Sequence, residues 1–193
     1  MSRLHYLAAL TYAILALVLG SRRHEGVQSV VVPPAVAPAV PRASDWWSRL
    51  KPLCNSVEVQ TGLSRMPPPP GPAGAGYAAA CLALAGRIDE ARTRILGLSG
   101  AERVTAAEIV FGVGHSVADM GDDRSAGPMM GLVVEFIPDH YMALYHAGIA
   151  VYGLGELDRA AGYLKRFLEL YHANDGWRTN ALEVLARREM QGR

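Results

Sequence analysis

The sequence predicts an all-α protein: a short α-solenoid of about three helix-turn-helix repeats, preceded by an N-terminal transmembrane or signal-anchor helix and a proline-rich linker. Near the N-terminus, an unbroken apolar run is followed by a segment of Val, Ala and Pro. Further on, small residues recur 34 positions apart, a period typical of stacked helix pairs. The recurring pairs are Gly114 and Gly148, Gly121 and Gly155, and Ala126 and Ala160. We expect them where a larger side chain would obstruct helix packing.

Residues 1–25 contain the predicted membrane anchor. Residues 6–20 (YLAALTYAILALVLG) carry no charge, with Arg3 before them and Arg22 and Arg23 after them. The run is shorter than the roughly 20 residues that cross a bilayer comfortably, but it is typical of a signal sequence or short signal anchor. We therefore expect it to contact the lipid bilayer. Because residues 18–20 form a poor cleavage site, an uncleaved anchor is favoured over a removed signal peptide.

The charges beside the apolar run do not set the orientation of this anchor. Basic residues stand on both sides of the apolar run, so the positive-inside comparison is nearly a tie. A leading anchor most often carries the rest of its chain across the membrane. We therefore expect the C-terminal part to be extracytoplasmic, in the periplasm.

Residues 26–43 are predicted to form an extended linker. Residues 26–41 (GVQSVVVPPAVAPAVP) lack helical periodicity and are rich in proline. A segment of this composition stays extended near about 3.1 Å per residue, so it could hold the folded part roughly 50 Å from the membrane. The alternative is that its valine-rich stretch adds to the surface of a partner.

Residues 44–71 are predicted to form a lead-in helix followed by a proline-rich turn. Ser44 and Asp45 are N-cap candidates ahead of an amphipathic pattern, which Pro52 interrupts. The run MPPPPG at 66–71 ends any helix. Trp46 and Trp47 are adjacent, so they cannot share one helix face, and we expect at least one of them near the surface.

Residues 72–174 hold the three repeats, framed as 72–105, 107–140 and 141–174, and residues 175–193 a C-terminal capping helix. In the middle repeat, the positions where small or apolar residues recur between the copies hold Val110, Val113, Gly114, Val117, Ala126, Met130, Val133 and Pro138. In the third they hold Leu144, Ala147, Gly148, Val151, Ala160, Leu164, Phe167 and His172. These residues resemble the tetratricopeptide repeat, a helix-turn-helix of 34 residues. One departure is Gly127-Pro128 inside the second helix of the middle repeat, which we expect to start late or kink.

The tetratricopeptide resemblance has two implications for individual residues. It places Cys81 on the first helix of its repeat, facing the preceding element that contains Cys54, so an exported chain is expected to join the two in a disulfide; the alternative is two buried thiols. Family members bind peptide segments on a concave face lined by the first helix of each repeat. By position, that partner-binding face would hold Phe111, His115, Asp119, Tyr145, Ile149 and Tyr152.

Several function classes are disfavoured by composition and spacing. The net charge is +1 and charged residues make up 19%, so the chain has no basic stripe for nucleic acid. His115 and Asp119 are four residues apart and close enough to hydrogen bond on one helix face. A metal site or a general base with its orienting carboxylate is conceivable there, but the sequence places no third ligand nearby. We therefore expect no metal, no cofactor and no enzymatic activity.

The function expected from the sequence is that of a membrane-anchored scaffold, an adaptor or assembly factor of the cell envelope that binds another protein. One alternative is a permanent accessory subunit of a multi-subunit membrane complex, such as a bioenergetic or secretion assembly. A remote alternative is a metal-dependent enzyme that uses His115 and Asp119. Stable co-purification would indicate the subunit, and stoichiometric metal would indicate the enzyme.

Overall fold

The computed structural model describes residues 42–191, and over this range the chain is all-α, with no strand. The predicted anchor and almost all of the predicted linker lie outside the described residues. Among the helices of the described range, none is both long and apolar enough to span a bilayer. The helices are α2 (Ala43–Leu50), α3 (Val59–Arg65), α4 (Pro72–Leu84), α5 (Ile88–Leu96), α6 (Gly100–Asp119), α7 (Asp123–Phe136), α8 (Tyr141–Gly153), α9 (Leu157–Leu170) and α10 (Gly176–Gln191).

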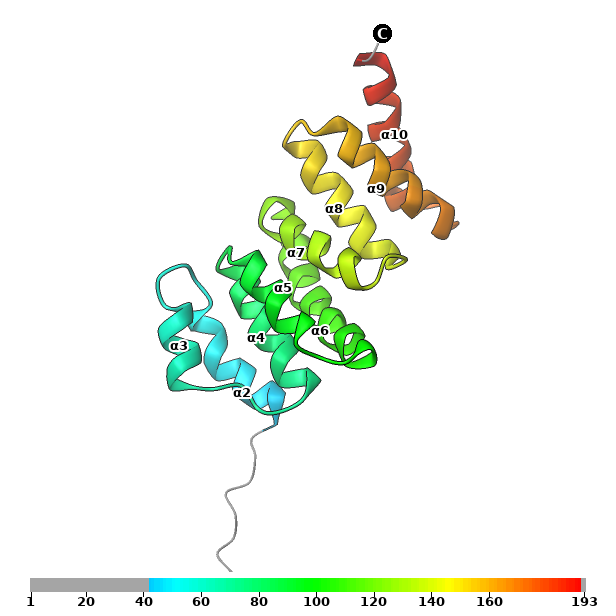
Figure 1. Ribbon diagram of the computed structural model, residues 1–193. Helices are drawn as coiled ribbons and strands as arrows, with labels where there is room; N and C mark the ends of the chain where they lie inside the picture. The colour runs from blue at the N-terminus through cyan, green and yellow to red at the C-terminus, as the bar shows by residue number, and fades with distance from the viewer. Residues whose placement is uncertain (1–41, 192–193) are drawn as a thin grey trace, which may run out of the picture. The chain divides into compact units, whose positions relative to one another are not determined.

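Three helix pairs follow one another along the chain: α4 with α5, α6 with α7, and α8 with α9 (Figure 1). Each helix packs against its partner in the pair, and the first helix of a pair also packs against the pair before it. Buried side chains that include Leu82, Ile95, Leu132 and Phe167 fill the seams between the helices. Most apolar residues of the repeat pattern thus belong to the core, whereas Val113 and Val117 are half-buried.

The turn inside each pair is built in the same way. It contains a glycine with positive φ: Gly86 at 78°, Gly121 at 86° and Gly155 at 79°. At the last of these, the N–H of Gly155 donates to the C=O of Tyr152 and the N–H of Glu156 to the C=O of Val151. This pair of bonds is the Schellman ending of a helix, which requires a left-handed residue at the glycine position.

Glycine is therefore needed at the recurring positions for two different physical reasons. No atom lies within 4 Å of a Cβ placed on Gly121 or Gly155, so the expectation that packing requires these two is wrong, and their positive φ is the reason. Packing does explain the other pair. A Cβ on Gly148 would lie 2.7 Å from Leu164 Cγ, and one on Gly114 would lie 3.2 Å from Met129 Cβ.

The lead-in segment differs from the single helix that we expected. It consists of α2, a 3-10 turn (Lys51–Leu53) and the separate helix α3. Pro52 lies in the 3-10 turn, where its missing N–H breaks the α-helical hydrogen-bond series. Asn55 stabilises the turn that leads into α3, because its Oδ1 accepts from the N–H groups of Val57 and Glu58 at 3.1 and 3.0 Å.

The two adjacent tryptophans of α2 point to different surroundings. The Trp46 side chain is 3% exposed, belongs to the core and donates its Nε1–H to the C=O of Met66 at 3.2 Å. The Trp47 ring is half-buried and stacks on Tyr77 of α4, with ring centroids 5.2 Å apart. Trp47 thus brings an aromatic ring to the surface beside α4.

A disulfide ties the lead-in segment to α4. It joins Cys54, just after the 3-10 turn, to Cys81 in α4, and the two Cα atoms are 4.7 Å apart. Cys81 is fully buried among the apolar residues of α4. The segment that contains α2 and α3 is therefore held to the first helix pair by a covalent bond as well as by packing.

The middle pair starts earlier than the predicted frame. α6 begins at Gly100, ahead of the expected Ala107, because Ser99 and Glu102 form a capping box in which the Ser99 N–H donates to Glu102 Oε2 at 3.1 Å. α7 also begins promptly and continues through Pro128, so the expected late start is wrong. Asp122 caps α7 by accepting the N–H of Ser125 at 3.0 Å, and hydrogen bonds from the side chain and then the backbone N–H of Ser125 lower the pKa of Asp122.

Candidate functional site

The predicted partner-binding face is carried by α6 and α8. On α6, the Phe111 ring stacks on His115 with centroids 5.0 Å apart and meets the His140 ring at 4.0 Å. His115 Nδ1 lies 3.4 Å from Asp119 Oδ2, and the Asp119 side chain is 55% exposed. The α6 part of the face is therefore one stacked pair of rings with an exposed carboxylate at its end, and the His140 ring, which precedes α8, is tilted against it.

The α8 part of the face is less open than we expected. Tyr145 is only 7% exposed because α10 covers it: Asn180 Nδ2 donates to the Tyr145 hydroxyl at 2.6 Å, and the Trp177 ring lies 4.8 Å away. This burial raises the pKa of Tyr145. Tyr145 is thus a core residue, and only Ile149 and Tyr152, both half-buried, keep some exposed surface.

A buried histidine that the sequence did not single out lies behind this face. His146 of α8 is 3% exposed, and its Nδ1–H donates to Asp123 Oδ1 of α7 at 3.2 Å. Burial lowers the pKa of His146, and the contact with Asp123 opposes this shift without cancelling it. The ring meets that of His115 at a centroid distance of 5.1 Å, and the Nε2 atoms of both rings are buried without a hydrogen-bond partner.

The pair of His115 and His146 brings few ligating groups together. Within residues 42–191, no group of three or more His, Cys, Asp or Glu side chains is arranged to hold a metal ion. The His146 ring faces the Asp123 carboxylate through Nδ1, and its burial lowers the pKa of His146, which favours the neutral imidazole with Nε2 as an acceptor. The His115 ring of α6 packs edge-on against this ring.

A more open site lies where α2, α4 and α6 meet. It is a hollow of about 340 Å³ lined mainly by apolar side chains. The stacked rings of Trp47 and Tyr77 and the side chain of Met120, which is 78% exposed, contribute to it. Lys51 is the one charged residue in its lining, and the lining backbone of Gly112 has free space around it. We call this hollow the aromatic groove.

The aromatic groove could be anticipated only in part from the sequence. The adjacency of Trp46 and Trp47 did predict that one ring lies near the surface. Tyr77 and Met120 were missed because they flank the repeat positions and carry no spacing signal of their own. What brings them together is the packing of α6 on α4.

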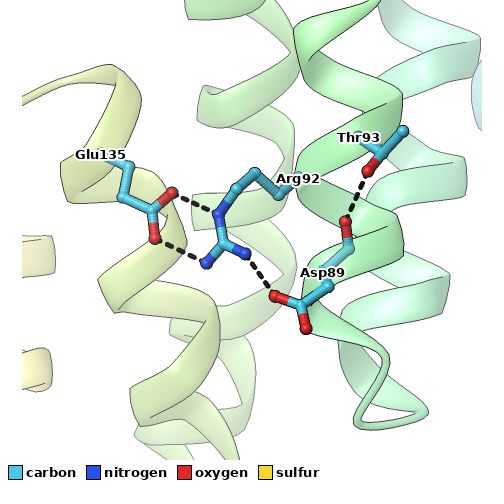
Figure 2. A network of polar contacts seen from close by, with 4 residues as sticks. All are labelled: Asp89, Arg92, Thr93 and Glu135. Carbon is cyan, nitrogen blue, oxygen red and sulfur yellow. Dashed lines mark hydrogen bonds and ion pairs between the residues drawn. The ribbon is translucent and has the colours of Figure 1, made fainter.

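On the side of the second helices, a polar network links α5 to α7. Arg92 of α5 donates from Nε and Nη2 to the two carboxylate oxygens of Glu135 in α7, at 2.6 and 2.8 Å, and its Nη1 pairs with Asp89 (Figure 2). These hydrogen bonds raise the pKa of the Arg92 guanidinium. The bidentate contact of Arg92 with Glu135 holds α5 and α7 in a fixed register at the surface.

Comparisons with known proteins complete the description of the site. No protein-family model and no curated protein matches this chain. The likeness to the tetratricopeptide repeat therefore depends on the repeated residues of the chain itself.

Proposed function

We propose that this chain is a membrane-anchored protein-interaction scaffold of the cell envelope, an adaptor or assembly factor built as a short tetratricopeptide-like solenoid. Three successive helix pairs with the same glycine turn support the repeat architecture. The charge-free run at residues 6–20 supports the anchor. Stacked helix pairs present extended surfaces, which proteins of this architecture use to bind other proteins.

The observation that carries this proposal is the aromatic groove. Aromatic and methionine side chains are enriched in protein interfaces, and buried aromatic anchors contribute most of the binding free energy there. Met120, directly after the end of α6, is the most exposed large apolar side chain of the three helix pairs, and it lines the same groove as Trp47 and Tyr77. A methionine can adjust its flexible side chain to a partner surface. We therefore assign the contact with the partner to this groove.

The test compares two methionine substitutions in the full-length chain. The protein is solubilised in detergent, and the proteins that bind to it are identified and quantified by mass spectrometry. Met120→Lys places a charge in the groove and should reduce capture of the partner at least tenfold, which corresponds to about 1.4 kcal/mol. Met190→Lys is the matched control, because Met190 is 68% exposed on α10 and lies outside the groove lining. Equal capture by both variants would contradict the proposal.

A chain without residues 1–42 separates two forms of the proposed function. If this shortened chain captures the same partner as the full-length chain, the helix pairs carry recognition and the anchor only localises them. If only the full-length chain captures it, and in a constant ratio after detergent extraction, the membrane segment is part of the interface. The protein would then be a permanent accessory subunit of a membrane complex.

A further inference from the structure

We propose a second binding site, beyond the protein-interaction function: a hollow on the side of the second helices that binds a single-chain amphiphilic anion, a fatty acid. Its apolar chain would lie on the floor formed by α7 and α8, and its carboxylate would pair with Arg124. The hollow lies between α5, α7, α8 and α9 and has a volume of about 350 Å³, at the small end of the range for ligand pockets.

The floor of this hollow is apolar and made of small or aliphatic side chains. Gly131 and Leu132 of α7 and Ala147 and Val151 of α8 belong to it. Their backbone groups are engaged in helical hydrogen bonds, so these four residues offer no free donor or acceptor, and the polar groups of the lining belong to other residues, Tyr163 among them. An apolar chain loses no hydrogen bond to water when it is buried here, and its transfer from water is favourable.

Two glycines of α7 line the hollow, and helix packing explains only the first of them. A Cβ on Gly127 would lie 2.2 Å from the Cβ of Ala150, so α7 needs glycine there. At Gly131 the nearest atom to a Cβ is the hydroxyl of Tyr163 at 3.9 Å, an ordinary contact. Glycine in the middle of a helix is less stable than alanine, and nothing in the packing compensates for it at Gly131. Its missing side chain leaves the hollow open.

The charges at the mouth select one anionic group. Arg92 is fully engaged by Glu135 and Asp89 (Figure 2), and Arg159 pairs with Glu156. For Arg124, by contrast, no carboxylate of the described residues lies within 4.0 Å of its guanidinium. A guanidinium binds a carboxylate well through two parallel N–H donors. The site therefore offers one unpaired cation beside an apolar floor.

This chemistry favours a fatty acid over a peptide with an apolar C-terminus. Both would offer a carboxylate and an apolar body. A peptide, however, would also bury N–H and C=O groups against a floor that cannot pair with them, and such burial is unfavourable. An acyl chain carries no such groups.

Photo-crosslinking of the full-length chain in lipid nanodiscs tests this site. The probe is decanoic acid with a diazirine on its chain, and mass spectrometry maps the labelled residues. We expect label on α7 and α8, removed by excess decanoate. Gly131→Leu should fill the hollow and reduce this label at least tenfold, and Arg124→Gln should do the same without adding volume. Gly162→Leu is the matched control, because Gly162 of α9 lies outside the lining of the hollow and no atom comes within 4 Å of a Cβ placed on it, and it should label like the wild type.

Several results would overturn the site. Label confined to other segments, or equal label in Gly131→Leu and Gly162→Leu, would show that the hollow is not used. Equal competition by decanol would show that no anionic group is recognised. Stronger competition by a peptide with an apolar C-terminus would assign the site to a protein. Gly131→Leu should still capture the protein partner, because the hollow and the aromatic groove use different helices. The fatty-acid site can therefore fail while the proposed partner binding stands, and the reverse.

Discussion

At Gly148 the backbone of α8 passes so close to α9 that no side chain fits. A Cβ there would lie 2.7 Å from two atoms of Leu164, which is itself fully buried. We expect Gly148→Leu to force the two helices apart. Overpacking of this kind destabilises a protein by about 1–3 kcal/mol, so the melting temperature should fall by several degrees in a thermal unfolding experiment followed by circular dichroism.

Gly162→Leu is the matched control for this substitution. Gly162 lies in α9, and no atom comes within 4 Å of a Cβ placed on it. Because leucine favours the helix more than glycine does, the control should melt at the same temperature as the wild type or slightly above it. A melting temperature that falls equally in both variants would contradict the assigned packing.

His146 makes the stability of the protein depend on pH. Its pKa in the folded protein is lowered from 6.5 by burial, whereas in the unfolded chain it is close to 6.5. Between these two values the unfolded state binds more protons, so the free energy of unfolding decreases as the pH falls through 6.5. Above both values the contribution does not change with pH. One titrating group can change this free energy by up to about 1.4 kcal/mol per pH unit.

Urea unfolding between pH 7.5 and pH 5.5 measures this effect. We expect the wild type to lose stability over this range and His146→Gln to lose clearly less, because glutamine does not titrate. His172→Gln is the control, since His172 is exposed after the end of α9, and it should keep the slope of the wild type. A slope that His146→Gln leaves unchanged would assign the pH dependence to other groups.

Among the elements, α2 and α3 depend most on the disulfide. The Cys54–Cys81 bond closes a loop with a sequence separation of 27 and joins this segment to α4. Chain-entropy estimates for such a loop give about 3.5 kcal/mol of stabilisation. We expect Cys54→Ala with Cys81→Ala to lower the free energy of unfolding by about 2–4 kcal/mol in urea. Reduction of the wild type should have the same effect without any change of sequence.

Hydrogen exchange locates this loss. Amides of α2 and α3 should exchange faster in the reduced protein, because packing alone then holds the segment to the first pair. Amides of α8 and α9, which belong to another pair, should be unchanged. Uniformly faster exchange would show that the disulfide stabilises the whole domain as one unit.

The sequence predicted the third helix pair best, and the reason is local. The predicted repeat frame that begins at Tyr141 agrees with the start of α8. Gly155 marks the turn because a positive φ favours glycine, and a glycine can be read directly from the sequence. The start of α6 was missed although Ser99 and Glu102 carry the signature of a capping box. At Pro52 the pattern gave a doubt about the helix, and the structure resolves it as a 3-10 turn.

The candidate sites were harder to predict because they join residues without a fixed spacing. The contact of His146 with Asp123 crosses from α8 to α7, and the burial of Tyr145 depends on Trp177 and Asn180 of α10. α10 was expected to cap the last repeat, but not to cover a residue of the proposed face. Such contacts are set by packing between helices, which a single sequence does not encode at any one position.

For the molecule as a whole, the open proposal is that an anchor at residues 6–20 carries the helix pairs across a membrane. A low net charge and a disulfide are both compatible with an exported domain, since disulfides persist in oxidising compartments. We expect a reporter enzyme that is active only after export to be active when fused to the C-terminus of the full-length chain, and inactive when residues 1–25 are deleted. A reporter active only in the cytoplasm is the control and should give the reverse.

The full-length chain should also stay with the membrane fraction after alkaline extraction, because an uncleaved apolar helix resists it. An active export reporter on a chain released by that extraction would instead assign residues 6–20 to a removed signal peptide, and an inactive one would place the helix pairs in the cytoplasm.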